Sequence, residues 1–337
     1  MEGDHISINH WLMPLSWLYG LGVGIRNLMF DAGMLKSQTF NLPVICVGNI
    51  TVGGTGKTPH TEYLIRLLAQ QYQVAVLSRG YKRQSKGFVL AKTDTPMPAI
   101  GDEPYQMKQK FPHIHMAVDK DRCHGIRQLM QADVQPPAEV VILDDAFQHR
   151  YVKAGLNILL MDYHRLSYLD RLLPAGRLRE PQRGCSRADI IIVTKCPRDI
   201  TQAERLQIRQ NLHLEKRQEV FFTTYRYPDH LDGLGDNPLL VTGIASPQQM
   251  TYDLQQMIPK FEVMSFPDHH NFTQQDIDHI RTRANGRTIL TTEKDATRLH
   301  GLEDVKVIPI KVEFLDGKGE AFNQLITNFV QQKTTTA

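Results

Sequence analysis

Cysteine is scarce in this 337-residue chain, and its scarcity limits what the protein can be. The four cysteines are scattered, and no two of them form a Cys-x-x-Cys pair: Cys46, Cys123, Cys185 and Cys196. This distribution argues against a zinc site and against a disulfide framework. It suits a protein that works in a reducing compartment.

An excess of either charge is also missing. Lys and Arg total 39 and Asp and Glu total 36, so the composition does not favour a nucleic-acid partner. The sequence contains no internal repeat and no low-complexity block. At this length the chain can bury the core of one large α/β domain or of two.

Long hydrophobic runs are absent as well, and the nearest approach to one lies close to the N-terminus. Residues 11–25 carry no charge, but Arg26 ends this run. The run is therefore short of the ~20 residues that a membrane-spanning helix needs. Glu2 and Asp4 stand where a secretory signal carries positive charge, so this segment is not expected to be a signal peptide.

The same segment predicts a helix with one strongly apolar face. Its apolar residues recur at three- and four-residue steps: Leu15, Leu18, Leu21, Ile25 and Leu28. Trp11, Trp17 and Tyr19 suit the headgroup region of a bilayer. Three placements are open: packing on the protein's own core, lying in a membrane interface, and spanning a membrane.

The middle of the chain alternates between apolar runs and helical patterns. The runs are rich in β-branched residues and predict buried strands: VICVGN, VAVLSRG, VVILDDAF, NILLMDY and DIIIVTK. Helical patterns between them predict a mostly parallel sheet flanked by helices. Further runs after about residue 201 predict a second, smaller α/β lobe, with a boundary near residue 200.

A glycine-rich loop follows the first of these strands. The eight residues TVGGTGKT fit the phosphate-binding pattern G-x-x-x-x-G-K-[ST], except that Thr51 replaces the first glycine. The loop is expected to bind a nucleotide through Thr51, Val52, Gly53, Gly54, Thr55, Gly56, Lys57 and Thr58. Its glycines let backbone N–H groups face phosphate oxygens, Lys57 reaches the β- and γ-phosphates, and Thr58 can ligate Mg²⁺.

An acidic partner for this loop is found in VVILDDAFQHR. Asp144 and Asp145 come at the carboxyl end of a predicted buried strand, where ligands bind in an open parallel sheet. One of them can hold Mg²⁺ and the other can contact a water or a basic residue. By position Gln148 is a further candidate for the metal.

Seven segments in order carry a family resemblance: VGNITVGGTGKTP, SRGYKR, GDEPYQM, DDAFQH, LLPAGRLREP, FPDHHNFT and TTEKD. Together they resemble tetraacyldisaccharide 4′-kinase, the lipid A 4′-kinase of Gram-negative bacteria. The resemblance runs from the N-terminal helix to about residue 315. Ala146 departs from the family's usual glycine in DDGFQH, a small-for-small change.

The resemblance implies a P-loop kinase on the cytoplasmic face of the bacterial inner membrane, using ATP and Mg²⁺. The acceptor would be the 4′-hydroxyl of an acylated glucosamine disaccharide 1-phosphate. The implied organisation is a membrane-associating helix over 1–35, a kinase core over 36–200 and a C-terminal α/β lobe over 201–337. The partners would be the lipid substrate and the inner-membrane surface, without nucleic acid.

Roles at the site also follow from the resemblance. Asp102 of GDEP would be the catalytic acid/base, with Glu103 assisting at the metal. An imidazole from FPDHHNFT would orient Asp102, and His269 is preferred over His270 for this. A helix cap for the two acids, and a metal site for the His-Asp cluster, are the alternatives.

The basic segments favour contacts to phosphate or substrate. Arg177, Arg179 and Glu180 of PAGRLREP and Arg79 of SRGY are the candidates, because planar guanidinium groups suit phosphate. The alternative for PAGRLREP is a solvated loop. Arg198 stands where an aspartate would select guanine, so adenine is favoured. A P-loop regulatory or metal-insertion NTPase, or a soluble ATP-dependent ligase-like enzyme of the same fold, are the other functional hypotheses.

Overall fold

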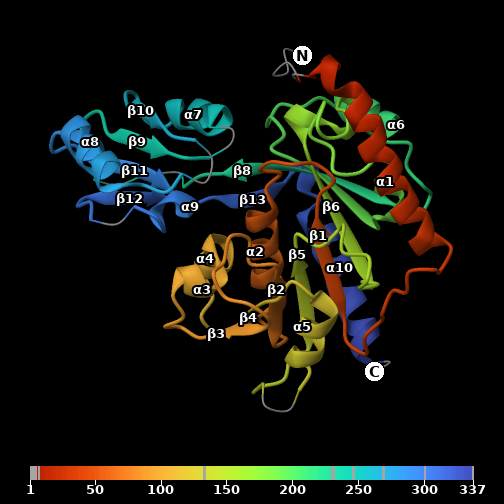
Figure 1. The fold of residues 1–337 in the computed structure, drawn as a ribbon. Coiled ribbons are helices and arrows are strands. Elements are labelled where there is room, and N and C mark those ends of the chain that lie inside the picture. The colour runs from red at the N-terminus through yellow and green to blue at the C-terminus, as the bar shows by residue number, and fades with distance from the viewer. Residues whose placement is uncertain are drawn as a thin grey trace. The chain divides into compact units, whose positions relative to one another are not determined.

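The computed structural model describes residues 6, 8–131, 134–228, 231, 233–244, 247–267, 270–299 and 301–335 (Figure 1). The chain forms two compact units. Unit 1 combines Met1–Thr224 with Val312–Ala337, and unit 2 is Tyr225–Lys311.

Unit 1 is built from alternating strands and helices. Its strands are β1 Val44–Gly48, β2 Val74–Ser78, β3 Val89–Ala91, β4 His115–Val118, β5 Val140–Asp144, β6 Leu156–Asp162, β7 Ile190–Thr194, and most of β8 Glu219–Arg226 and of β13 Lys311–Phe314. Its α-helices are α1 Met13–Asp31, α2 Lys57–Leu68, α3 Met97–Ile100, α4 Asp102–Lys110, α5 Arg122–Leu129, α6 Gln202–Asn211 and α10 Gly319–Thr335. Short 3₁₀ turns lie at η1 His10–Leu12, η2 Tyr163–Arg165, η3 Ser167–Leu169, η4 Gln182–Arg187 and η5 Leu315–Gly317.

The strands form one sheet in the order β13-β8-β7-β6-β1-β5-β2-β4-β3. The pairings from β4 through to β8 are parallel, and β3 is antiparallel to β4. All five residues of β1, β2, β5 and β7 are buried, as expected for strands covered on both faces. The predicted mostly parallel, helix-flanked sheet is confirmed.

Alternate strand residues pack into two separate cores. Cys46 and Leu77 belong to the core that α5 and α6 cover. Ile45 and Val76 belong to the core that α2, α4 and α10 cover. Figure 1 shows α10, from the end of the chain, lying against the strands of this sheet.

Helix α1 has two different faces. On the inner face Ser16 and Asn27 are buried, and at two glycines the helix backbone comes very close to the rest of unit 1. A Cβ on Gly20 would lie 2.7 Å from Leu172 Cδ1, and one on Gly24 would lie 3.0 Å from Arg183 Nη2. The outer face is apolar and exposed: Leu15, Trp17, Leu18, Leu21, Ile25 and Leu28 are each more than half exposed. Packing on the core therefore accounts for one face only.

The structure bears on the third placement of this helix, a span across a membrane. Within the described residues, no helix combines the length and the apolar character that crossing a membrane requires.

Unit 2 is a smaller α/β unit. Its sheet has the order β10-β9-β11-β12, with every pairing parallel. Its strands are β9 Leu239–Thr242, β10 Glu262–Ser265, β11 Ile289–Thr292 and β12 Val305–Ile308, and its helices are α7 Gln248–Gln255, α8 Gln274–Ala284 and α9 Glu293–Ala296. The predicted second lobe is thus present.

The units divide at other positions than the boundary drawn near residue 200. The strand β8 pairs with β7 and extends the large sheet, so the chain up to Thr224 stays in unit 1. Beyond Lys311 the chain returns to unit 1, where Phe322, Ile326 and Val330 of α10 are buried. Hydrophobic runs show where strands are, but they carry no information about which sheet each strand joins.

One buried histidine ties the first turn of α2 to the large sheet. His60 is 3% exposed, and its Nδ1 lies 2.8 Å from Gly56 O and its Nε2 3.1 Å from Thr223 Oγ1. Burial lowers the pKa of His60 to about 4. The folded protein therefore holds this imidazole neutral at pH values where the unfolded chain would protonate it.

We expect His60 to make the protein acid-sensitive. Between pH 6.5 and about 4 the unfolded state binds more protons than the folded state, so stability falls as pH falls through this window. The loss reaches on the order of 3 kcal/mol, because a pKa difference of one unit corresponds to about 1.4 kcal/mol. His60→Asn should lower stability at pH 7.5 and flatten this dependence. Urea unfolding from pH 7.5 to 4.5 measures both. The exposed His213, changed to Asn, should keep the wild-type pH dependence of stability. If stability of His60→Asn fell with pH as steeply as that of the wild type, His60 would not be the source of the acid sensitivity.

Candidate active site

Polar residues gather where the parallel strands of the large sheet end. Ser78 ends β2, Asp144 ends β5, Asp162 ends β6 and Thr194 ends β7, while Asn49 directly follows β1. Because neighbouring parallel strands present their carboxyl ends at one edge, these side chains share one region. This is the edge at which an open α/β sheet binds its ligands.

The glycine-rich loop leaves β1 at this edge and is held by side chains from several elements. The Asn49 amide donates to Thr55 Oγ1 at 2.7 Å, and Thr194 Oγ1 donates to Thr55 O at 3.0 Å. The Lys195 ammonium donates to Gly54 O. Gly53 and Gly56 have φ angles of 121° and 82°, which favour glycine. These contacts fix the backbone conformation of the loop that precedes α2, and the N-terminus of this helix can bind an anion.

Thr51 fits because its end of the loop is extended rather than turned. It forms an isolated β-bridge with Leu178, and its Oγ1 donates to Arg177 O at 3.2 Å. The Val52 amide also donates to Arg177 O, and the Arg179 amide donates to Ile50 O at 2.7 Å. A strand-like position needs no positive φ, so a threonine replaces glycine there without strain.

The Asp145 carboxylate meets two cations. Lys57 Nζ lies 3.7 Å from its Oδ1, and Arg179 Nη1 lies 3.3 Å from both oxygens. Burial opposes ionisation of Asp145, but the Lys57 and Arg179 charges hold its pKa below the usual value. The lysine of the phosphate loop, the strand-end acid and the PAGRLREP arginine therefore meet at one place.

The Asp144 carboxylate is in the opposite electrostatic state. It is 1% exposed, and its Oδ2 accepts from Ser78 Oγ at 3.1 Å. Its Oδ1 is buried and has no hydrogen-bond partner among the residues that the structure describes. Burial, together with the charges of Glu103 and Asp145, raises the pKa of Asp144 to about 7. A buried, unpartnered carboxylate oxygen beside two further acids has the chemistry of a site for a hard divalent cation.

The candidates for that cation come from four segments. They are Thr58 in the first turn of α2, Glu103 in the first turn of α4, Asp144 and Asp145 after β5, and Gln148. The Gln148 amide nitrogen donates to Asn49 O at 2.7 Å, which ties it to the base of the phosphate loop. These oxygen donors fit Mg²⁺, although Asp145 is already paired with Lys57 and Arg179.

Asp102 and Glu103 begin α4 and are partly exposed. The turn that precedes them packs closely on the segment that follows β2, since a Cβ on Gly101 would lie 2.9 Å from Tyr81 O. Gly101 has a φ of 91°, so a side chain there would be strained as well as crowded. The Glu103 charge acts on Asp144, which places this helix start near the acid pair.

The histidine segment lies in unit 2, and Asp268 and His269 fall outside the described residues. His270 Nε2 is 3.0 Å from Asp276 Oδ2, and its ring stacks on Phe266 with a centroid distance of 4.9 Å. His270 therefore has a structural partner within its own unit. The pairing of Asp102 with His269 stays a prediction.

The candidate residues of SRGY and PAGRLREP differ in exposure and in their partners. Arg79 and Arg177 are exposed and Arg179 contacts Asp145, so all three can reach a ligand. Glu180 differs from the substrate contact expected of it, since it is 2% exposed and accepts from Asn27 and Arg187. Its position is that of a structural anchor, because buried carboxylates need internal partners.

Sequence reasoning missed Arg122. It is 3% exposed, and its Nη2 donates to Asp145 O at 3.4 Å. Burial lowers the pKa of its guanidinium, with Arg79 adding to the effect. The signal that could have revealed it is positional: Arg122 lies shortly after Val118, the last residue of β4, which is one more parallel strand of the same sheet.

Among the described residues, three side chains of metal-ligating types lie together, although the scattered cysteines argued against a zinc site. Ligand atoms of Asp121, Cys123 and His149 lie within 4.8 Å of one another. Asp121 Oδ1 caps α5 by accepting from the Cys123 amide, and the Cys123 thiol donates to Tyr151 O. Burial lowers the pKa of His149 to about 4, and nearby arginines including Arg122 add to this shift. A local excess of positive charge does not favour a cation there.

The comparisons with known proteins agree with one another. Residues 8–331 match the family model described as tetraacyldisaccharide-1-P 4′-kinase. The tetraacyldisaccharide 4′-kinases of Phocaeicola vulgatus and Bacteroides fragilis are 54% and 50% identical to this chain. The alignments cover 99% of this chain and 98% and 96% of those proteins. A crystal structure of LpxK from Aquifex aeolicus in complex with ATP is 33% identical, with a TM-score of 0.75 over 96% of this chain and 99% of that one.

The state of Asp144 predicts how cation binding depends on pH. Its raised pKa means that a cation must displace a proton below about pH 7, so affinity should rise from pH 6 to 8 and then level off. Mn²⁺ binding, followed by loss of the free-ion EPR signal, measures this. Asp144→Asn should bind Mn²⁺ more weakly and lose this rise. The exposed Asp199, changed to Asn, should behave as wild type, and a flat wild-type profile would contradict the assignment.

Proposed function

Because the chain belongs to the tetraacyldisaccharide-1-P 4′-kinase family and is an ATP-dependent 4′-kinase of lipid A synthesis, we propose that phosphoryl transfer takes place at the carboxyl edge of the large sheet. The observation that carries this is the meeting of Lys57, Asp145 and Arg179 beside the buried Asp144. The regulatory NTPase and the ligase-like alternatives are not favoured.

The phosphate loop binds the β- and γ-phosphates of ATP in this proposal. Backbone N–H groups of residues 51–58 face the phosphate oxygens, and the start of α2 adds its positive end. Lys57 then exchanges its contact with Asp145, at 3.7 Å, for the stronger one with the γ-phosphate. Arg79, Arg177 and Arg179 provide further cations for the phosphates of ATP or of the acceptor.

Mg²⁺ would be held by the oxygen donors around Asp144, with Thr58, Glu103, Asp145 and Gln148 as the other candidates. When bound, it neutralises charge on the phosphate oxygens. The unpartnered Oδ1 of Asp144 supports this assignment, because a buried carboxylate oxygen is costly without a partner.

Asp102 acts on the acceptor. The 4′-hydroxyl oxygen of the sugar attacks the γ-phosphorus, the bond from that phosphorus to the β,γ-bridging oxygen breaks, and ADP leaves. The hydroxyl proton passes to the Asp102 carboxylate. His269 would orient this carboxylate.

The outer face of α1 binds the bilayer that contains the acylated acceptor. We define the apolar face as Leu15, Trp17, Leu18, Leu21, Ile25 and Leu28, each more than half exposed. Trp11, just ahead of α1, is 93% exposed and suits the headgroup region. Interfacial helices bind in proportion to the apolar area that they bury. The inner-membrane surface on the cytoplasmic side, where ATP is available, is the proposed location.

Two variants test the site directly. Lys57→Ala should reduce turnover by roughly 10²-fold or more, because it removes electrostatic stabilisation of the transferring phosphoryl group. Asp102→Asn should reduce kcat by about 10²–10⁴-fold with little change in ATP affinity, since the amide cannot accept a proton. Single-turnover rates and nucleotide titrations separate the two effects. Near-normal phosphoryl transfer by Lys57→Ala would refute the assignment of the phosphate loop.

A third variant tests the membrane role. Leu18→Ser should weaken binding to phospholipid vesicles by roughly tenfold, because a leucine side chain buried in lipid contributes about 1.5 kcal/mol. Co-sedimentation with vesicles measures this binding. The matched control is Leu206→Ser, since Leu206 is 56% exposed but lies on α6. Equal binding of the two variants and the wild type would show that the apolar face does not meet the bilayer.

A further inference from the structure

The inner face of α1 holds the segment that follows β6. Ser16 Oγ donates to Leu172 O at 3.0 Å and accepts from the Ala175 amide at 2.9 Å. One and two turns further on, Gly20 and Gly24 allow the helix backbone to approach Leu172 and Arg183 closely. A helix that needed only to anchor the protein would not require this fit.

The polar side chains of α1 reach two residues of the proposed active site. Tyr19 Oη donates to Arg179 O at 2.9 Å, and Arg26 Nη2 donates to Gln148 O at 3.0 Å. Both bonds are made to backbone carbonyls, so they fix the position of the chain itself.

Arg179 and Gln148 each continue the connection to the phosphate loop. The Arg179 amide donates to Ile50 O, and its guanidinium contacts Asp145. The Gln148 side chain donates to Asn49 O, and the Asn49 amide in turn donates to Thr55 Oγ1. Two short chains of hydrogen bonds therefore run from α1 to Ile50 and Asn49, the two residues that lead into the phosphate loop, and the second chain continues to Thr55 within it.

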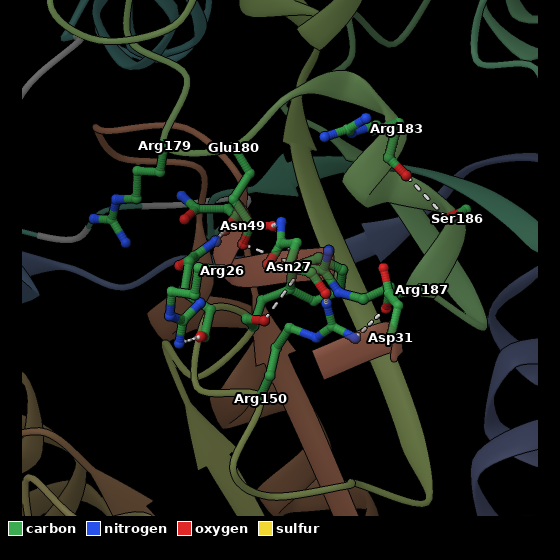
Figure 2. Close-up of polar contacts among 12 residues, drawn as sticks. Arg26, Asn27, Asp31, Asn49, Arg150, Arg179, Glu180, Arg183, Ser186 and Arg187 are labelled. Carbon is green, nitrogen blue, oxygen red and sulfur yellow. Dashed lines mark hydrogen bonds and ion pairs between the residues drawn. The ribbon is translucent and has the colours of Figure 1, made fainter. Parts of the chain in front are cut away.

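A buried cluster makes this attachment rigid. The Asn27 amide donates to Glu180 Oε2 at 3.1 Å, and Arg187 pairs with the same carboxylate at 2.9 Å (Figure 2). The Arg187 guanidinium also lies over the Phe147 ring, 4.6 Å from its centroid. Because Glu180 follows Arg179 and Phe147 precedes Gln148, this cluster joins the two segments that α1 contacts.

We propose that α1 is a positioning element for phosphoryl transfer, in which Tyr19 and Arg26 hold Arg179 and Gln148 in their working positions against the phosphate loop. The proposal rests on the function proposed above, because it needs Arg179 to act in the transfer. In this proposal the apolar face of α1 binds lipid, while its polar face sets the geometry of the site. Binding of the helix to a bilayer and the geometry of the phosphate loop are thereby joined through one rigid element.

The test separates a loss of kcat from a loss of binding. Tyr19→Phe and Arg26→Gln should each reduce kcat at saturating ATP and acceptor by about fivefold, the equivalent of about 1 kcal/mol. Acceptor KM, vesicle binding and melting temperature should stay close to wild type, because the apolar face is unchanged. Arg26→Lys, which keeps a cationic donor, should recover part of the rate.

Matched controls make the same chemical changes elsewhere. Tyr252→Phe alters an exposed tyrosine, and Arg281→Gln removes an arginine that also donates to a backbone carbonyl, that of Gly301. Both control variants should keep wild-type kcat. Unchanged kcat in Tyr19→Phe and Arg26→Gln, or a change confined to KM or vesicle binding, would overturn the proposal.

A double-mutant cycle then shows whether Tyr19 acts through Arg179. Arg179→Ala alone should lower kcat, and adding Tyr19→Phe to it should cost little more, because the group that Tyr19 positions is gone. Multiplicative losses would mean that Tyr19 acts by another route and would overturn the positioning role. Wild-type kcat in Arg179→Ala would instead refute the role of Arg179 in the proposed function.

Discussion

Two adjacent carboxylates at the carboxyl end of β5 set the electrostatics on which the site depends. Lys57 and Arg179 keep Asp145 ionised, whereas burial and neighbouring acids raise the pKa of Asp144 to about 7. The phosphate loop, the PAGRLREP segment and α4 each bring a charge to this one place. If the phosphate loop or the PAGRLREP segment moved, Asp145 would lose one of the two cations that lower its pKa.

The N-terminal helix shows how one element can serve two environments. Its outer face carries exposed leucines and an exposed tryptophan, while its inner face carries serine, glycine and asparagine that fit closely to unit 1. The 3.6-residue period of the helix keeps these two sets apart. The exposed apolar face that we propose to meet lipid and the inner face that fits the site therefore belong to one helix.

Much of the fold could be predicted because strands buried on both faces read as continuous apolar runs. VICVGN, VAVLSRG, VVILDDAF, NILLMDY and DIIIVTK became β1, β2, β5, β6 and β7. The division of the chain could not be predicted in the same way. The strand β8 resembles the strands of unit 2 in composition, yet it pairs with β7, and α10 returns to unit 1. Pairing depends on contacts between distant segments, which a local pattern does not encode.

The sequence by itself determined the phosphate loop, the acid pair after β5 and the apolar face of α1, because each is encoded within a few neighbouring residues. Only the tertiary structure decided that Glu180 is a buried anchor, that Arg122 reaches Asp145 and that α1 bonds to Arg179 and Gln148. Asn27 and Glu180 are separated by 153 positions in the chain. Such pairs form when folding brings distant segments together, and their hydrogen bonds follow from burial rather than from any local motif.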